Sequence, residues 1–232
     1  MGVKRQFAVL TALALATVLP LFAQKKEDPR LQDSATVLQE IMKGDDGLPK
    51  HILDEADCVL IFPSVKKVAI GIGGSYGRGA LICRTGEDMK GKWGAPAMYA
   101  LDQGSIGLQL GSTATDFVLV VMSQKGVEHI LNGKTKLGSS AAAAAGPTGA
   151  HANTYNAAAM QVDVLTYSRS KGLFAGVSLE GASMDADKDA NKNLYGREMT
   201  AKEIVTTEPP PPAAKPLVSL LDTKSPTQMA EH

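Results

Sequence analysis

The stretch VAIGIGGSYGRGALI, from Val68 to Ile82, decides the fold that the sequence predicts. Large and small residues alternate through its first half, and glycine recurs along all of it. Because successive residues of a strand point to opposite faces, a strand here would have one bulky face and one nearly bare face. Such a stretch suits a phosphate-cradling loop, an elbow that presents a nucleophilic serine, or a closely packed hairpin. The residues from Arg78 onward alternate again, which favours the returning strand of a hairpin.

Two further stretches, SIGLQLGS at 105–112 and LFAGVSLEG at 173–181, repeat this alternation of bulky and small residues. Glycine weakens an isolated strand, so its repetition on one face indicates sharp curvature or the close approach of another segment. The apolar runs CVLIF at 58–62 and DFVLVVMS at 116–123 are typical of buried central strands. We therefore predict an α+β fold with a strongly curved antiparallel β-sheet that closes toward a barrel, N-terminal helices and a short C-terminal helix.

Helices are expected at both ends of the domain. Apolar residues recur at helical spacing over residues 30–43, which predicts an amphipathic helix. A second, short helix is expected from Pro49, because proline is favoured at the first helical position, and TAKEIV predicts another that begins near Thr200. Residues 141–160 are rich in alanine, but glycine and proline interrupt any helix there. We expect that segment to lie tightly against the sheet.

The chain of 232 residues has room for one domain with appendages. Residues 1–23 have the form of a secretory signal peptide, with early positive charges, an apolar run and a small residue before a polar segment. A retained membrane anchor is the alternative, which Pro20 and the short run disfavour. We expect a linker at 24–29, the folded domain at 30–206 and a proline-rich, disordered tail at 207–232. The protein is then exported, either to a periplasm or outside the cell, free or associated with a membrane.

The charge and cysteine content set further limits. The formal net charge is zero, from 24 basic and 24 acidic residues, so the bulk charge does not point to a nucleic-acid partner. Cys58 and Cys83 would be able to pair in an oxidising compartment, but two separately buried thiols are an equal alternative. The histidines and cysteines have no metal-ligand spacing. No metal and no cofactor are therefore expected.

Three short motifs resemble catalytic signatures. The run GGSYG matches the nucleophile elbow with Ser75 as the nucleophile, but an elbow requires a helix after its serine. Tyr167 and Lys171 have the spacing of short-chain dehydrogenases without the glycine-to-helix context of that fold. The run SRSK matches S-x-x-K without its partner motifs. We expect no catalytic residue and no enzyme, with a serine hydrolase acting through Ser75 as a remote alternative.

Basic side chains recur near the ends of the expected strands. A cluster of them would attract anionic lipid headgroups by about 1 kcal/mol per charge, and successive backbone amides in a tight turn are able to form an anion-binding concavity. Ordinary solvated loop charges are the alternative. The candidate headgroup-binding residues are Lys66, Lys67, Arg78, Arg84, Arg169 and Lys171, and the candidate backbone amides are those of Gly74, Ser75 and Gly77.

Several ordered runs resemble the SYLF domain: LPKHILDEADCVLIFPSVKKVAIGIGGSYGRGALICR, GSIGLQLGSTATDFVLVVMS and LTYSRSKGLFAGVSLEGASMDAD. The resemblance extends over residues 30–206. It implies a lipid-binding module, because eukaryotic members bind phosphoinositides, and yeast members are also described as actin-binding. With its expected signal peptide, the chain is similar to the exported bacterial members.

The resemblance and the strand-end cations together predict a non-enzymatic lipid-binding protein of the bacterial cell envelope. Anionic phospholipid or a phosphoinositide-type headgroup is the expected ligand, with the helix at 30–43 adding apolar contact. An envelope scaffold, whose proline-rich tail recruits protein partners, is the alternative.

Overall fold

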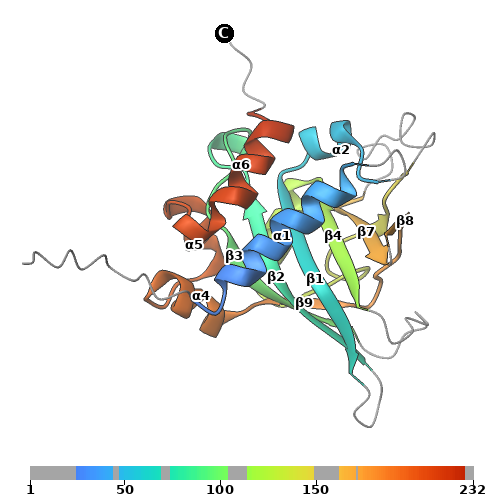
Figure 1. Cartoon of the computed structure of the whole chain (residues 1–232), viewed down its shortest axis with the longest axis horizontal. Helices are drawn as coiled ribbons and strands as arrows, with labels where there is room; N and C mark the ends of the chain where they lie inside the picture. Colours follow the sequence, from blue (N-terminus) through green and yellow to red (C-terminus); the bar gives the residue numbers. More distant parts are fainter. Residues whose placement is uncertain are drawn as a thin grey trace, which may run out of the picture.

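A curled sheet forms the centre of the computed structural model, which describes residues 25–43, 47–68, 74–103, 114–148, 162–170 and 172–227. In this described part the nine-stranded sheet has the order β5-β9-β3-β2-β1-β4-β7-β6, with β8 paired to β7 beside this path (Figure 1). The predicted α+β fold with a strongly curved sheet is confirmed. The strands are β1 (Cys58–Val68), β2 (Gly74–Cys83), β3 (Ala97–Gln103), β4 (Thr115–Val121), β5 (Thr135–Lys136), β6 (Ala143–Ala145), β7 (Val164–Ser170), β8 (Leu173–Gly176) and β9 (Ser183–Ala186).

The two predicted central strands lie at the middle of the sheet, and one edge strand departs from the predicted antiparallel arrangement. CVLIF and DFVLVVMS supply neighbouring antiparallel strands, β1 and β4, at the middle of the sheet. The alanine-rich β6 pairs with β7 in parallel, so the expectation of a wholly antiparallel sheet is wrong at this edge. Parallel neighbours need a long connection, and the chain has residues 146–163 between these two strands.

The described part of the glycine-rich stretch, from Gly74 onward, forms a strand rather than a loop or an elbow. Its residues from Gly74 onward belong to β2, which lies between β1 and β3 in the sheet. A side chain at Gly79 would overlap the carbonyl of Ile61, and one at Gly176 would overlap the backbone of Gly146. Glycine is therefore required at these two positions because another backbone lies close. At Gly176 that backbone belongs to the segment 141–160, whose described part ends at residue 148 and which was expected to lie tightly against the sheet. The repeats at 69–73 and 105–112 lie outside the described residues.

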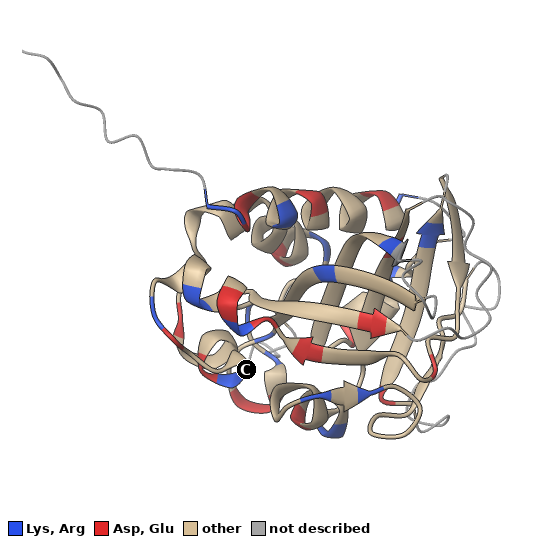
Figure 2. Ribbon diagram, turned by 90° about the horizontal axis from the view of Figure 1, so that it is seen from below, with Lys and Arg blue, Asp and Glu red and all other residues tan. Residues whose placement is uncertain are grey.

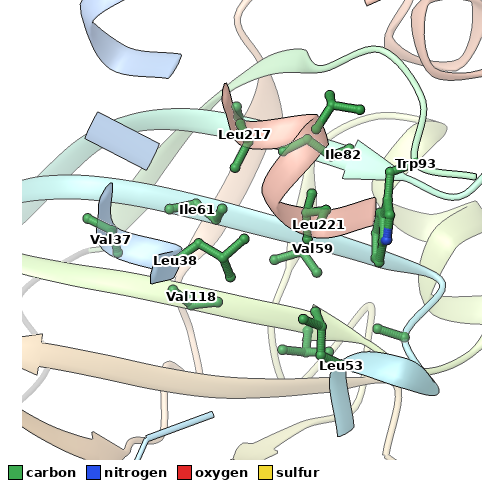
Figure 3. Packing of buried hydrophobic residues seen from close by; sticks show 14 of the residues in the cluster. Val37, Leu38, Leu53, Val59, Ile61, Ile82, Trp93, Val118, Leu217 and Leu221 are labelled. Carbon is green, nitrogen blue, oxygen red and sulfur yellow. The ribbon is translucent and has the colours of Figure 1, made fainter. Parts of the chain in front are cut away.

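Six helices surround the sheet in the described ranges. On one face α1 and α6 pack over β1 and β4, where Leu38 and Leu221 lie among Val59, Ile61 and Val118 (Figure 3). On the other face a second buried cluster joins the sheet to α3 and α5. The helices are α1 (Asp28–Ile41), α2 (Lys50–Asp54), α3 (Gln124–Leu131), α4 (Lys188–Tyr195), α5 (Ala201–Thr207) and α6 (Lys215–Lys224).

Both predicted N-terminal helices and the helix after Thr200 are present. Thr200 caps α5 in a capping box with Glu203, which satisfies backbone amides that the first turn leaves open. The predicted linker at 24–29 is wrong for its described part, because Glu27 is buried and accepts a hydrogen bond from Asn193 Nδ2 at 2.6 Å. The folded domain thus starts before residue 30.

The predicted disordered tail at 207–232 is also wrong where the structure describes it. After an exposed run of prolines, α6 packs against α1 and buries Leu217 and Leu221 completely. These two leucines are four residues apart, so they share one helix face. Pro216 lies in the first turn of α6, where a missing N–H costs no hydrogen bond.

A disulfide joins the two central strands. Cys58 on β1 lies directly opposite Cys83 on β2, and their Cα atoms are 4.0 Å apart. The alternative of two free thiols is thereby excluded. The bond lies in the buried cluster on the side of α3 and α5.

Candidate functional site

A β-bulge in β1 positions the one surface where the predicted cations gather. Ile61 lies opposite Ala80 on β2, but Lys66 lies opposite Tyr76, so the register shifts by one residue between them. In an unbroken strand Ile61 and Val65 would share a face, yet they belong to opposite cores. The bulge therefore places Lys66 on the same side as α1, which is the kind of re-aiming that bulges perform.

The bulge depends on an unusual backbone conformation at Ser64. Its φ of 51° lies in the left-handed region that non-glycine residues rarely adopt. The Ser64 N–H donates to Oδ1 of Asp116 on β4 at 2.8 Å. A carboxylate from the neighbouring strand thus holds the strained residue in place, and burial raises the pKa of Asp116.

A hollow of about 460 Å³ lies between the N-terminal part of α1 and this end of β1 and β2. We call it the cationic hollow. Prolines, Ser64, Tyr76 and Gly77 form the uncharged part of its lining. Its charged lining residues are Lys26, Arg30, Asp33, Lys66 and Arg78.

Arg78 is held at the edge of the hollow by two partners. Its Nε donates to the Tyr76 hydroxyl at 2.8 Å and lies 3.2 Å from Oδ2 of Asp187. The hydrogen bond to Tyr76 and the charge of Asp187 raise the pKa of Arg78. Its side chain remains 40% exposed, so part of the guanidinium is free to meet a ligand.

Arg30 on α1 carries the donor that its surroundings leave unused. Burial and the nearby charge of Arg78 lower its pKa, while Asp187 and Glu27 act in the opposite direction. Its Nη1 is buried and has no hydrogen-bond partner among the described residues. A buried donor without a partner is costly, and an anion that reached it would form a charge-assisted hydrogen bond.

The prediction that Arg84 binds a lipid headgroup is wrong. This side chain is 0% exposed and lies 4.4 Å from the ring centre of Trp93. Its guanidinium donates to the carbonyls of Ala56, Gly91, Ser225 and Pro226 and to the hydroxyl of Ser225. These hydrogen bonds connect the segment after α6 to the end of β2, and the buried guanidinium of Arg84 has no access to a headgroup.

Arg169 is also structural, so its assignment to headgroup binding is wrong. It is 23% exposed and forms ion pairs with Glu40 of α1 and with Asp116, the latter at 2.7 Å. Its charge is therefore used to join α1 to the sheet. The side chain of Lys67, and Lys171 as a whole, lie outside the described residues.

The predicted backbone anion site is absent from β2. Ser75 pairs with Lys67 on one side and Gln103 on the other, Gly74 pairs with β1, and Gly77 pairs with Leu101 on β3. Their amides belong to sheet ladders rather than to a tight turn. Ser75 is also followed by more strand, so the helix that a nucleophile elbow requires is missing.

The sequence prediction missed Lys26 and Arg30, which line the hollow beside Lys66 and Arg78. Arg30 lies in the first turn of α1, and Lys26 lies in the turn just before that helix. Both belong to the charged run KKEDPR at 25–30, which is visible in the sequence. The predicted cations all lie near the ends of expected strands, and neither Lys26 nor Arg30 belongs to a strand.

Two negative findings apply to the described ranges. They hold no cluster of three or more His, Cys, Asp or Glu side chains that is arranged to bind a metal. None of their helices combines the length and apolarity that a membrane crossing requires.

Comparison with known proteins places this architecture in a family. The family model Ysc84, described as Las17-binding protein actin regulator, matches residues 102–224. The chain belongs to the Ysc84, or SYLF, family. The match extends through α6, so the family domain does not stop at residue 206 as predicted.

Curated relatives from yeasts and mammals are similar over most of this chain. The SH3 domain-containing protein PJ696.02 of Schizosaccharomyces pombe is 34% identical over 76% of the chain. LAS seventeen-binding protein 3 of Saccharomyces cerevisiae is 31% identical over 88%, and the human SH3 domain-containing YSC84-like protein 1 is 31% identical over 76%. The matched regions cover 41%, 45% and 51% of these three relatives. Their names are those of binding proteins or of proteins that contain an SH3 domain, and none is that of an enzyme.

Proposed function

We propose that this Ysc84-family chain is a non-enzymatic module that binds anionic phospholipid surfaces through the cationic hollow. The observation that carries the proposal is the convergence of four cations on one hollow. Arg30 comes from α1, Lys66 from β1 and Arg78 from β2, and Lys26 comes from the turn just before α1. Asp33 is the one carboxylate among the described residues that line the hollow. Arg30 adds a donor without a partner among the described residues.

The charge distribution favours binding at one local cationic site over attraction by the charge of the whole protein. The whole chain has no net charge, and in Figure 2 basic and acidic positions are interspersed along the ribbon of the described residues. A cation near an anionic membrane surface contributes about 1 kcal/mol. Four cations within one hollow are therefore enough for measurable binding, whereas the remaining surface would contribute little.

We also propose that the protein works outside the cytoplasm, in a bacterial envelope. The pattern of residues 1–23 and the Cys58–Cys83 disulfide both support an exported protein, since disulfides persist in oxidising compartments. An intact mass of the protein purified from its own cells tests this. Loss of the first residues together with an oxidised cysteine pair is expected, and a full-length mass with two free thiols contradicts it.

Vesicle flotation tests the lipid proposal directly. Vesicles of phosphatidylcholine alone are compared with vesicles that also contain about 30% phosphatidylglycerol, whose anionic headgroups give the membrane a negative surface potential. The double variant Arg30→Gln, Lys66→Gln should bind about thirtyfold more weakly, from two charges of about 1 kcal/mol each. The matched control is Lys215→Gln, Lys224→Gln, which removes two exposed lysines of α6. Equal weakening by both pairs rejects the hollow as the site.

A second candidate function is protein binding through the proline run between α5 and α6. Glu208 (φ −86°, ψ 145°) and Pro211 (φ −66°, ψ 157°) have polyproline II angles, and Pro209, Pro210 and Pro212 lie near them. Because α5 and α6 are packed, the run is pre-ordered for an aromatic-lined groove. Titration of an SH3 domain from a relative should give binding that Pro209→Ala, Pro210→Ala abolishes, and an unchanged titration rejects this candidate.

A further inference from the structure

Stable attachment to a membrane requires apolar contact as well as charge, and α1 does not provide it. The expected apolar stripe of this helix is present, but Leu31, Leu38 and Ile41 are all fully buried against the sheet and α6. The sequence-based expectation that this helix adds apolar membrane contact is therefore wrong. Any apolar contact has to come from another part of the surface.

Two large hydrophobic side chains are exposed in the described part of the chain. Tyr76 is 41% exposed and Leu173 is 77% exposed. Single exposed hydrophobic residues are ordinary on protein surfaces. The position of these two relative to the cationic hollow is what gives them a role.

The strand register places both residues at one end of the sheet. Tyr76 pairs with Lys66 on β1, and the preceding Val65 pairs with Thr115 on β4. The next residue of β4, Asp116, pairs with Arg169 on β7, which is followed by Ser170 opposite Leu173. We call this end of the sheet, which also carries the hollow, the open end.

The local structure directs Leu173 away from the core. It begins β8, which among the described strands pairs with β7 alone, and it follows Gly172, whose φ of 79° lies in the left-handed region. The adjacent Phe174 packs against the α1-side core, so Leu173 leaves the sheet on the opposite face. Tyr76 lies on the α1 face in the hollow. The two side chains thus flank the open end from both faces.

We propose that the open end is the membrane-contacting end and that Leu173 enters the boundary between headgroups and acyl chains when the hollow binds anionic lipid. This inference rests on the proposed lipid function. Phosphate groups would meet Lys66 and Arg30 while the leucine reaches deeper, the arrangement in which charge and buried apolar area act together at an interface. It assigns the protein an orientation on the bilayer.

Site-specific fluorescence tests the orientation. The disulfide occupies both native cysteines, so Leu173→Cys gives a single labelling site for an environment-sensitive dye. Addition of phosphatidylglycerol vesicles should shift its emission to the blue, and lipids brominated near the headgroup should quench it. The control is Lys224→Cys at the end of α6, next to Ser225, which Arg84 holds beside the opposite end of β2. Its dye should stay unchanged.

Leu173→Ala provides a second measurement on unlabelled protein. It should weaken vesicle binding about five- to tenfold, because much of a leucine's transfer free energy is lost. Added salt should not alter this ratio, whereas it should shrink the effect of Arg30→Gln, Lys66→Gln. Unchanged binding by Leu173→Ala together with a silent dye at 173 overturns the inference and leaves the hollow standing. Loss of flotation by the wild-type chain overturns the lipid function and the orientation with it.

Discussion

The two ends of the β1–β2 hairpin differ although both carry arginine. The closed end is the one at which Cys58 is bonded to Cys83. There the guanidinium of Arg84 donates its hydrogen bonds to backbone carbonyls, including those of Ala56 and Pro226. At the open end, Arg78 is partly exposed and Arg30 has an unused nitrogen. The same side chain is thus structural where the backbone surrounds it and available where it does not. Charge alone does not separate these roles, but burial and hydrogen bonding do.

The largest expected effect is at the closed end. Arg84→Ala should lower the free energy of unfolding by about 4 kcal/mol, because several buried carbonyls lose their donor. Urea denaturation measures the loss. Vesicle binding by the folded fraction should stay at the wild-type level, and a specific loss of lipid binding would show that Arg84 has the role the structure denies it.

The disulfide should contribute slightly less. For a sequence separation of 25 residues, loop-closure entropy predicts a loss of about 3.5 kcal/mol in the Cys58→Ala, Cys83→Ala variant. Denaturation of the wild type with and without a reductant gives the same comparison. The reductant should leave the alanine variant unaffected, and this serves as the control.

At the open end, substitutions of Ser64 test whether the strained backbone of the bulge matters for lipid binding. Ser64→Gly should raise the free energy of unfolding by up to about 1 kcal/mol, since glycine adopts a positive φ without strain. Ser64→Val should lower it by about 1–2 kcal/mol and also weaken vesicle binding, because the bulge aims Lys66 into the hollow. Thermal denaturation and flotation are measured in parallel. Normal lipid binding by a folded Ser64→Val protein would disconnect the bulge from the site.

The last effect concerns the pH dependence of stability at the closed end. Burial raises the pKa of Asp57 from 3.8 to about 6, so the folded state holds its proton more tightly than the unfolded state does. Stability should therefore fall as pH rises from about 4 to about 6 and level off above that. Asp57→Asn should flatten this part of the curve of melting temperature against pH. An unaltered slope in the variant assigns the dependence to another group.

Sequence patterns predicted the elements that depend on local chemistry. The valine-rich runs gave β1 and β4, the helical spacing of Leu31 and Leu38 gave α1, and Thr200 marked the start of α5. The helix α4 was missed, although Asp187 caps it and Gly196 ends it in the left-handed conformation. Neither Asp187 nor Gly196 alone indicates a helix, but the two cap residues together bound a segment of helical length.

The failures share a physical cause, which is that they depend on contacts between distant parts of the chain. The prolines before α6 suggested disorder, but Leu217 and Leu221 become ordered by packing against α1. The site was half predicted, since Lys66 and Arg78 reach the hollow and Arg84 and Arg169 do not. Which cations become engaged depends on distant partners, because Arg169 pairs with Glu40 of α1 and Arg84 bonds to Ser225 after α6. No local pattern encodes these contacts.

The contact between α1 and α6 has a consequence for biosynthesis. The first and last helices of the described chain complete one shared core, which also includes Ala214 and Leu217 from the C-terminal segment. A nascent chain cannot complete that core until α6 has left the ribosome. Premature termination before residue 215 would uncover the part of the apolar stripe of α1 that α6 buries, and such a fragment is expected to be a target for proteolysis.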